Sequence, residues 1–321
     1  PLAAGLGELR AAAARWVGRR FGAALDPDTE VVPTLGSKEA IFSLAQIVVN
    51  RASGRDVVVV PTPGYPVAAR GAAFAGAEVL EAVLDPARGW LPDPDALPWD
   101  RVALVWLTSP GNPTGAVAPP ALMDELAARC RAHGAVLASD EAYCELWFGD
   151  RAPHSALELA DRTGVLAFHT LSKRSSMPGY RSGFVAGDPE LVAALKRFRP
   201  SVGTAPQTFV QRASVAAWDH DDHVAQARAR YAAKREVLLP ALLDLGLEDV
   251  GGDASFFLWL RVAAGDDDDE AFAARLLTEV GIVVAPGSYL GTGGSGHVRV
   301  ALVPNLEACA RAAELLAGWR P

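Results

Sequence analysis

The chain has 321 residues, of which 50% are hydrophobic and 21% are charged, and its formal net charge is -8 at pH 7. This size and apolar content predict a soluble globular protein with a substantial core in two domains, and the negative charge argues against nucleic acid or an anionic membrane as the main partner. No apolar run approaches the roughly 18 residues of a membrane span, no signal peptide opens the chain, and the three cysteines show no CxxC spacing, so we expect a cytoplasmic protein with reduced thiols.

The first predicted element is a helix over residues 8–20, in which Leu9, Ala13 and Trp16 recur at helical spacing. Because the chain opens on proline directly before this helix and lacks an initiator methionine, we expect that an upstream segment is missing. A strand at 31–34 and a second helix follow, joined by Gly36-Ser37. A Gly-Ser turn that opens a helix offers free backbone amides to a phosphate, although Ser37 by itself is better explained as an N-cap.

Short apolar runs rich in β-forming residues then alternate with helical patterns such as residues 121–131. The runs lie at residues 57–60, 79–84, 102–107, 135–139 and 165–168. This alternation predicts an α/β fold with a mostly parallel open sheet covered by helices on both faces. Ligands of such sheets bind beyond the carboxyl ends of the strands. The loops that start at residues 61, 109, 140 and 169 should therefore converge on one edge.

The stretch from 169 to 184 is the centre of this prediction. Lys173 comes where a strand ends, and two hydroxyls, Thr170 and Ser172, lie close to it in sequence. Arg181 follows a Pro-Gly turn that can fold it back. A guanidinium binds phosphate bidentately, hydroxyls add directional donors, and a lysine forms a Schiff base with an aldehyde, so the cofactor that this set implies is pyridoxal phosphate. Taken alone, the stretch is better explained by a solvated surface lysine.

The other loops supply the remaining groups that this cofactor needs. Asp140 could pair with the pyridine nitrogen and keep it protonated, so that the ring accepts electrons from a developing carbanion. Tyr143 and Asn112 could donate to the ring oxygen, and Tyr65 could stack on the ring face. Each has an ordinary alternative: Asp140 a helix cap, Asn112 a turn residue, Tyr65 a packed aromatic.

The second half of the chain predicts a helix at 188–198, a loop at 201–207 and a long helix from 219 to about 246, kinked at Pro240. After it we expect strands at 255–262, 282–284 and 297–302, a solvated acidic loop at 266–270, and helices at 271–280 and 306–319. The predicted organisation is an N-terminal helix at 1–24, a large cofactor-binding domain at 25–218, and a linking helix with a small C-terminal domain at 219–321.

One charged residue and two apparent motifs in this half have more than one interpretation. Arg299 interrupts an apolar strand, so it must be paired or face a cleft, where it could bind an α-carboxylate; an ordinary salt bridge is the alternative. The GxGxxG pattern at 291–296 has a strand after it rather than before it, so we interpret it as a loop and not a dinucleotide site. His220 and His223 are better explained as a solvated helix start than as metal ligands, and we expect no metal.

Several of these segments match the motifs of one known family in the right order and at plausible spacing: Ser109-Pro110-Gly111-Asn112-Pro113-Thr114-Gly115, Asp140-Glu141-Ala142-Tyr143, Ser172-Lys173, Gly179-Tyr180-Arg181-Ser182-Gly183 and Val298-Arg299. The chain therefore resembles, over essentially its whole length, the fold-type I, class I/II aminotransferases that use pyridoxal phosphate. Residues 33–39 and 171–177 look most like the actinobacterial N-succinyldiaminopimelate aminotransferases of lysine biosynthesis.

The resemblance implies roles for particular residues. Lys173 would bind the cofactor aldehyde and carry the proton, Asp140 would face the pyridine nitrogen, and Asn112 and Tyr143 would bind the ring oxygen. The phosphate would be surrounded by Ser37, Lys38, Thr170 and Arg181, and the ring would meet Tyr65. Arg299, together with Asn112, would bind the substrate carboxylate.

For the activity, the resemblance implies transfer of an amino group between an amino acid and a 2-oxo acid, in a homodimer with a shared active site. Other aminotransferases of the class, of aspartate, aromatic or alanine type, stay open, as does a C-S β-lyase of the same fold. A regulatory protein that keeps the fold without turnover is a further alternative.

Overall fold

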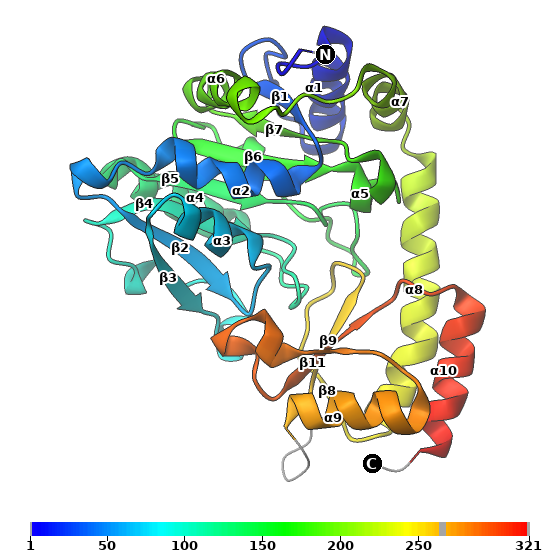
Figure 1. The fold of residues 1–321 in the computed structure, drawn as a ribbon. Coiled ribbons are helices and arrows are strands. Elements are labelled where there is room, and N and C mark those ends of the chain that lie inside the picture. Colours follow the sequence, from blue (N-terminus) through cyan, green and yellow to red (C-terminus); the bar gives the residue numbers. More distant parts are fainter. Residues whose placement is uncertain (1, 263–267, 320–321) are drawn as a thin grey trace.

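The fold is that of a computed structural model, which describes residues 2–262 and 268–319. Its larger sheet has seven strands in the order β1-β7-β6-β5-β4-β2-β3 (Figure 1). The strands are β1 (Val31–Thr34), β2 (Val57–Thr62), β3 (Glu78–Val83), β4 (Val102–Thr108), β5 (Val136–Asp140), β6 (Val165–Thr170) and β7 (Gly183–Gly187). Strands β3, β2, β4, β5 and β6 run parallel, whereas β7 is antiparallel to both β6 and β1. The predicted, mostly parallel open sheet is confirmed.

Helices cover both faces of this sheet. One face carries α2 (Ser37–Val48), α3 (Val67–Phe74) and α6 (Pro189–Phe198), and the other carries α1 (Gly7–Phe21), α4 (Pro120–His133) and α7 (Thr208–Asp219). Alternate residues of one strand serve the two faces: Val58 and Val60 pack toward α2 and α3, and Val57 and Val59 toward α4. Because both faces are buried, the strands form continuous apolar runs in the sequence, which made them recognisable.

A second, antiparallel sheet lies in the C-terminal part of the chain, in the order β10-β11-β9-β8. Its strands are β8 (Glu248–Asp249), β9 (Phe257–Arg261), β10 (Ala285–Pro286) and β11 (His297–Ala301), and its helices are α9 (Asp269–Arg275) and α10 (Leu306–Gly318). Helix α8 (Asp222–Leu243) runs from the end of α7, beside the larger sheet, down to α10 (Figure 1). It therefore connects the two parts of the molecule that each contain a sheet.

Several sequence-based boundaries were wrong. Strand β7 was not predicted; it has only five residues, and glycine, which has a low β-propensity, lies at both of its ends. The long helix predicted from 219 begins at Asp222, and α7 before it was missed; His220, in extended conformation, separates the two. The strand predicted at 282–284 is a loop, and the two-residue β10 follows it.

Other predictions for this half can be compared directly. Pro240 lies inside α8 without ending it. The GxGxxG segment forms short 3-10 turns that lead into β11, not the strand-turn-helix of a dinucleotide site. Of the acidic loop, positions 266 and 267 lie outside the described residues, and Asp268 caps α9 through the amide of Ala271. None of the described helices is both long and apolar enough to cross a membrane.

Candidate active site

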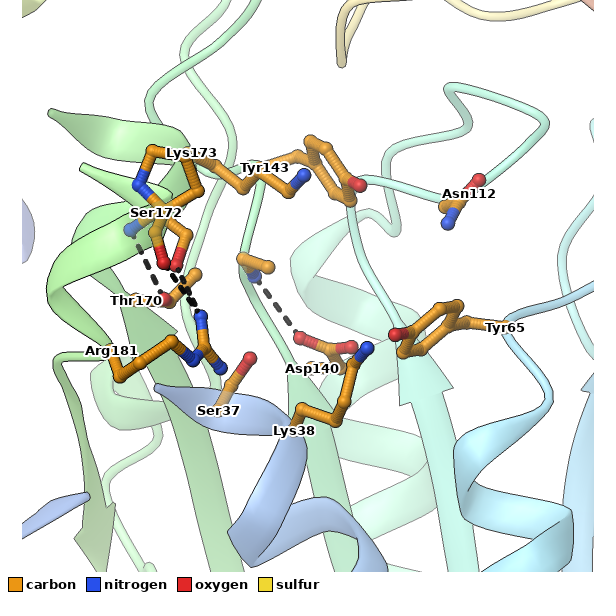
Figure 2. Close-up of a pocket in the computed structure, with 12 residues that line it drawn as sticks. Ser37, Lys38, Tyr65, Asn112, Asp140, Tyr143, Thr170, Ser172, Lys173 and Arg181 are labelled. Carbon is orange, nitrogen blue, oxygen red and sulfur yellow. Dashed lines mark hydrogen bonds between the residues drawn. The ribbon is translucent and has the colours of Figure 1, made fainter. Parts of the chain in front are cut away.

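A cavity of about 410 Å³ opens at the carboxyl ends of the parallel strands (Figure 2). The four loops predicted to converge all contribute to it, together with the start of α2. The side chains that line it belong to Ser37, Lys38, Tyr65, Asn112, Asp140, Ala142, Tyr143, Thr170, Ser172, Lys173, Pro178 and Arg181. Nine of these twelve residues were predicted as cofactor ligands from the sequence.

Arg181 and the start of α2 form one end of the cavity. The Pro-Gly turn is a 3-10 turn, Pro178–Tyr180, that folds Arg181 back as predicted. Its guanidinium donates to the Pro178 carbonyl and, at 3.4 Å, to Ser172 Oγ, and a second nitrogen donates to the Leu35 carbonyl at 3.0 Å. These bonds hold a cation beside Ser37, which Figure 2 shows at the same end.

The first turn of α2 adds backbone donors at this end. The N-cap is Gly36 and not Ser37, so Ser37 is the first helical residue and its hydroxyl lines the cavity. The first amides of a helix have no partner within the helix and lie at the positive end of its dipole. Gly36 has φ +75° and lies so close to Arg181 that a Cβ would be 2.7 Å from Nη2, so glycine is required there. The arrangement is that of an anion site.

Lys173 projects from α5 (Leu171–Arg174), a single helical turn that follows β6 directly. Thr170 caps this turn: its hydroxyl accepts from the Ser172 amide at 3.2 Å and donates to the Ser182 carbonyl at 3.2 Å. The Lys173 ammonium lies 4.9 Å from the ring centre of Phe256 and 5.6 Å from that of Tyr143. Burial, followed by the positive charges of Arg299 and Lys38, lowers the pKa of Lys173.

Asp140 ends β5 in the middle of the cavity wall, between Arg181 and Tyr65 in Figure 2. One carboxylate oxygen accepts from the Ala142 amide at 3.2 Å, and no helix follows, so the helix-cap alternative is wrong. Burial raises the pKa of Asp140 to about 6, although the Ala142 amide and the charge of Lys173 oppose that shift. Because these two interactions do not offset the cost of burying the charge, the Asp140 carboxylate is suited to a cationic partner in the cavity.

Arg299, on β11 of the second sheet, contacts the cavity-lining residue Asn112. It donates to Asn112 Oδ1 at 3.0 Å, and its guanidinium lies 4.5 Å from the ring centre of Phe257. Its Nε is buried without a hydrogen-bond partner among the described residues. A buried donor of this kind fits an incoming carboxylate and not the ordinary salt bridge that was the alternative.

In Figure 2, Lys38 lies between Arg181 and Tyr65, and Tyr65 lies on the far side of the cavity from Arg181. The ammonium of Lys38 is 5.5 Å from the ring centre of Tyr65 and points toward Asp140 and Tyr65 in Figure 2, whereas Arg181 points toward Ser37 and Ser172. Lys38 was predicted beside the phosphate. Its ammonium lies in the same cavity, next to Asp140 in Figure 2, and its place beside the phosphate stays a prediction.

The remaining residues of the site were predicted to different extents. Ser172, one of the two hydroxyls expected to donate to a phosphate, lines the cavity and accepts a hydrogen bond from Arg181. Phe256 and Phe257, which lie against Lys173 and Arg299, are apolar residues at the start of a strand, and nothing in that pattern distinguishes them from core residues. His223 hydrogen-bonds Ser175 Oγ at 2.8 Å, and within the described residues no group of three or more His, Cys, Asp or Glu could hold a metal ion.

The chemical groups of the cavity, and the order in which they follow one another along it, fit pyridoxal phosphate. One end presents a guanidinium, hydroxyls and helix amides for a phosphate, the middle presents a buried carboxylate for a pyridine nitrogen, and a lysine amine and an arginine complete the site. The cavity, of about 410 Å³, is of a size typical for a cofactor site.

Comparisons with known proteins agree with this site. A model of the family described as aminotransferase class I and II matches residues 2–316. An LL-diaminopimelate aminotransferase of Nitratidesulfovibrio vulgaris (strain DSM 19637 / Miyazaki F) is 37% identical over 313 residues, which cover 96% of this chain and 80% of that protein. An aminotransferase structure from Neisseria meningitidis superposes with a TM-score of 0.91 at 39% identity, covering 99% of this chain and 84% of that one. A variant of Thermus thermophilus aspartate aminotransferase superposes with a TM-score of 0.89 at 30% identity, covering 99% and 82%.

The fold and the cavity together define an α/β enzyme that works with pyridoxal phosphate. The chain belongs to the class I and II aminotransferases, and it is a pyridoxal-phosphate-dependent aminotransferase of fold type I. The family, fold, enzyme class and cofactor predicted from the sequence are confirmed. The relative above is named for LL-diaminopimelate, so it does not support the narrower resemblance to the N-succinyl type.

Proposed function

We propose that this aminotransferase uses LL-diaminopimelate as amino donor and a 2-oxo acid, 2-oxoglutarate, as acceptor. The observation that carries the proposal is the ammonium of Lys38, a cation that lines the cavity in addition to Lys173 and Arg181. Arg181 serves the phosphate end and Arg299 can take the α-carboxylate, so the ammonium of Lys38 remains for a second anionic group on the substrate. Diaminopimelate has such a group in its distal carboxylate, and the named relative supports the same substrate.

We assign the binding roles as follows. Ser37, Ser172, Arg181 and the first amides of α2 hold the phosphate, and Thr170 supports them by capping the turn that carries Ser172. Asp140 accepts from the protonated pyridine nitrogen. Tyr65 covers one ring face, and the Tyr143 hydroxyl donates to the ring oxygen. Arg299, held by Asn112, binds the substrate α-carboxylate and so fixes the orientation of Cα.

When bound, pyridoxal phosphate supplies an aldehyde that takes up the substrate amino group and a ring that accepts the electron pair left at Cα. Lys173 would move the proton: its amine would take the proton from the substrate Cα at Nζ. The lowered pKa of Lys173 favours the neutral amine that this step requires. Positioned acid-base catalysis of this kind contributes about a hundred- to ten-thousand-fold. Phe256 and Tyr143 lie beside Nζ, which is 4.9 Å from the ring centre of Phe256 and 5.6 Å from that of Tyr143.

The test is single-turnover absorbance spectroscopy of the cofactor-loaded enzyme with five donors: LL-diaminopimelate, its N-succinyl derivative, glutamate, aspartate and an aromatic amino acid. We expect LL-diaminopimelate to give the highest ratio of rate to apparent binding constant. A clear preference for the N-succinyl derivative would replace the proposed donor with the one first predicted from the sequence. A preference for aspartate or an aromatic donor would reject both, and release of pyruvate and ammonia would indicate a β-lyase.

A variant separates the role of Lys38 from a general loss of activity. Lys38→Met should raise KM for LL-diaminopimelate about tenfold or more, which corresponds to one lost charge-assisted contact. KM for alanine, which has no distal carboxylate, should change little. Equal effects on both donors would contradict the assignment of Lys38 to the distal carboxylate.

A further inference from the structure

Arg174, the residue after Lys173, is almost completely buried although it carries a charge. Only 2% of its surface is exposed, and its guanidinium lies between two tryptophans, 5.4 Å from the ring centre of Trp16 and 5.0 Å from that of Trp218. A buried guanidinium is unfavourable unless its donors are satisfied. Its partners therefore indicate what its position serves.

Both terminal nitrogens of Arg174 donate to the junction between α7 and α8, whereas Nε lies 3.9 Å from Glu145 Oε1 without a hydrogen-bond partner among the described residues. Nη1 donates to the Ala217 carbonyl at 2.6 Å, and Nη2 donates to the His220 carbonyl at 3.3 Å and to the carboxylate of Asp221, the N-cap of α8. The next residue repeats the connection, since Ser175 Oγ hydrogen-bonds His223 in the first turn of α8. The turn that carries Lys173 is thus bonded to the start of the helix that leads to the second sheet.

Helix α8 also lies behind Lys173 farther along its length. Tyr231 of α8 stacks on Phe256, with ring centres 5.2 Å apart and an interplanar angle of 25°. Phe256 in turn lies 4.9 Å from the Lys173 ammonium. One helix therefore supports both the backbone turn that holds the lysine and the aromatic ring that its amine lies against.

The turn α5 has only four residues, and a helix of this length has no stability of its own. Its orientation depends on the groups that tie it to the rest of the protein. Arg174 supplies three such bonds on the side away from the cavity. Because Arg174 and Lys173 are adjacent in one turn, a shift of Arg174 moves the Cα from which the lysine side chain extends.

We propose that Arg174 is a positioning residue that fixes the Lys173 amine by bonding its helical turn to the start of α8. This proposal rests on the role given to Lys173 above and not on the identity of the amino donor. The reaction requires Nζ to reach first the cofactor aldehyde and then the Cα proton. A displacement of about 1 Å in such a group can lower turnover about a hundredfold.

The test compares Arg174→Met and Arg174→Lys with a matched control, Arg162→Met. Arg162 also donates to two backbone carbonyls, those of Leu157 and Ala24, and forms an ion pair with Glu30, but it lies away from α5. Thermal unfolding measures the structural cost of each change. We expect both methionine variants to lose stability.

Two readouts isolate the positioning role. In Arg174→Met, kcat with glutamate should fall about ten- to a hundredfold while KM changes less than about threefold, because the lysine and not the carboxylate site is disturbed. In the protein prepared without cofactor, the pH dependence of the rate at which Lys173 bonds to added pyridoxal phosphate reports on the amine itself. Its midpoint should rise toward that of an ordinary lysine, because the amine is no longer held against Phe256.

Arg174→Lys keeps the charge but loses the forked geometry, so it should restore part of both properties. If Arg174→Met does not fold, Arg174→Lys alone tests whether Arg174 positions the Lys173 amine. A wild-type kcat and pH profile in Arg174→Lys would then overturn the proposal. Arg174→Met with the kcat and pH profile of Arg162→Met would overturn it too. If the unmodified chain forms no bond at Lys173, the role of Lys173 fails and this proposal fails with it.

Discussion

The carboxylate of Asp140, the proposed partner of the pyridine nitrogen, is energetically unfavourable in its charged form when no cofactor is bound. Only 8% of the residue is exposed, and burial raises the pKa of its carboxyl from 3.8 to about 6. A shift of this size corresponds to about 3 kcal/mol. Because the folded pKa lies above the unfolded one, the penalty is complete above about pH 6 and absent below about pH 3.8.

Asp140→Asn should therefore stabilise the cofactor-free protein in a pH-dependent way. We expect its free energy of unfolding to exceed that of the unmodified protein by up to about 3 kcal/mol at pH 8, with a difference that shrinks toward zero near pH 4. With cofactor, the same variant should lose about a hundredfold in kcat, because the ring nitrogen loses its anionic partner. Urea unfolding at both pH values measures the first effect, with Asp100→Asn, whose side chain is fully exposed, as control. A gain independent of pH would show that burial of the charge is not the cause.

At the level of the element, the link between α2 and Arg181 depends on one glycine. Gly36 adopts φ +75° and ψ 171°, a conformation nearly restricted to glycine that costs other residues about 1–3 kcal/mol. A Cβ there would be 2.7 Å from Arg181 Nη2. The guanidinium can avoid the methyl group only by leaving its contacts with Leu35 and Ser172, and the first turn of α2 would shift as well.

Gly36→Ala should weaken pyridoxal phosphate binding about tenfold or more and lower stability by about 1–3 kcal/mol. Gly22→Ala is the matched control: Gly22 also has a positive φ, +70°, but a Cβ there would meet no atom within 4 Å. It should lose stability without losing cofactor affinity, as measured by titrating each cofactor-free variant with pyridoxal phosphate and following protein fluorescence. Equal loss of affinity in both variants would assign the effect to backbone strain and not to the Arg181 site.

The elements also show why the sequence predicted some parts and not others. Parallel strands buried on both faces are continuous apolar runs, and their carboxyl ends share one edge, so the amino-acid pattern was enough to place the loops with Lys173 and Asp140 together. Strand β7 has glycine at both ends and does not belong to the series of parallel strands. It is recognised as a strand only by its antiparallel pairing with β6 and β1. Phe256 was missed for a different reason: its role comes from contact with Lys173 across the two sheets, which no local spacing encodes.

At the scale of the whole molecule, the hydrogen bond between Arg299 and Asn112 requires the two sheets to keep a fixed relative position. Arg299 lies on β11 of the second sheet, and Asn112 lies in the loop after β4 of the larger sheet. Trp90, in the loop after β3, connects them: its ring lies 6.1 Å from that of Trp259 and 5.3 Å from that of His297, and its Nε1 donates to the Val250 carbonyl at 2.6 Å. In the register of the second sheet, Trp259 is paired with Arg299. Trp90 therefore packs against the strand pair that carries Arg299, the residue proposed to bind the α-carboxylate.

Trp90→Ala should consequently affect substrate binding as well as stability. Loss of a buried tryptophan costs about 3–5 kcal/mol, and a looser second sheet should raise KM about tenfold for both the amino donor and the 2-oxo acid, since both present an α-carboxylate to Arg299. Trp99→Ala is the control, because Trp99 is also buried but packs within the larger sheet and donates to Pro94. If both variants fold and lose similar stability but only Trp90→Ala raises KM, the contact between the sheets governs Arg299. A parallel rise in KM in both variants, or none in either, would mean that Arg299 is held by its own strand alone.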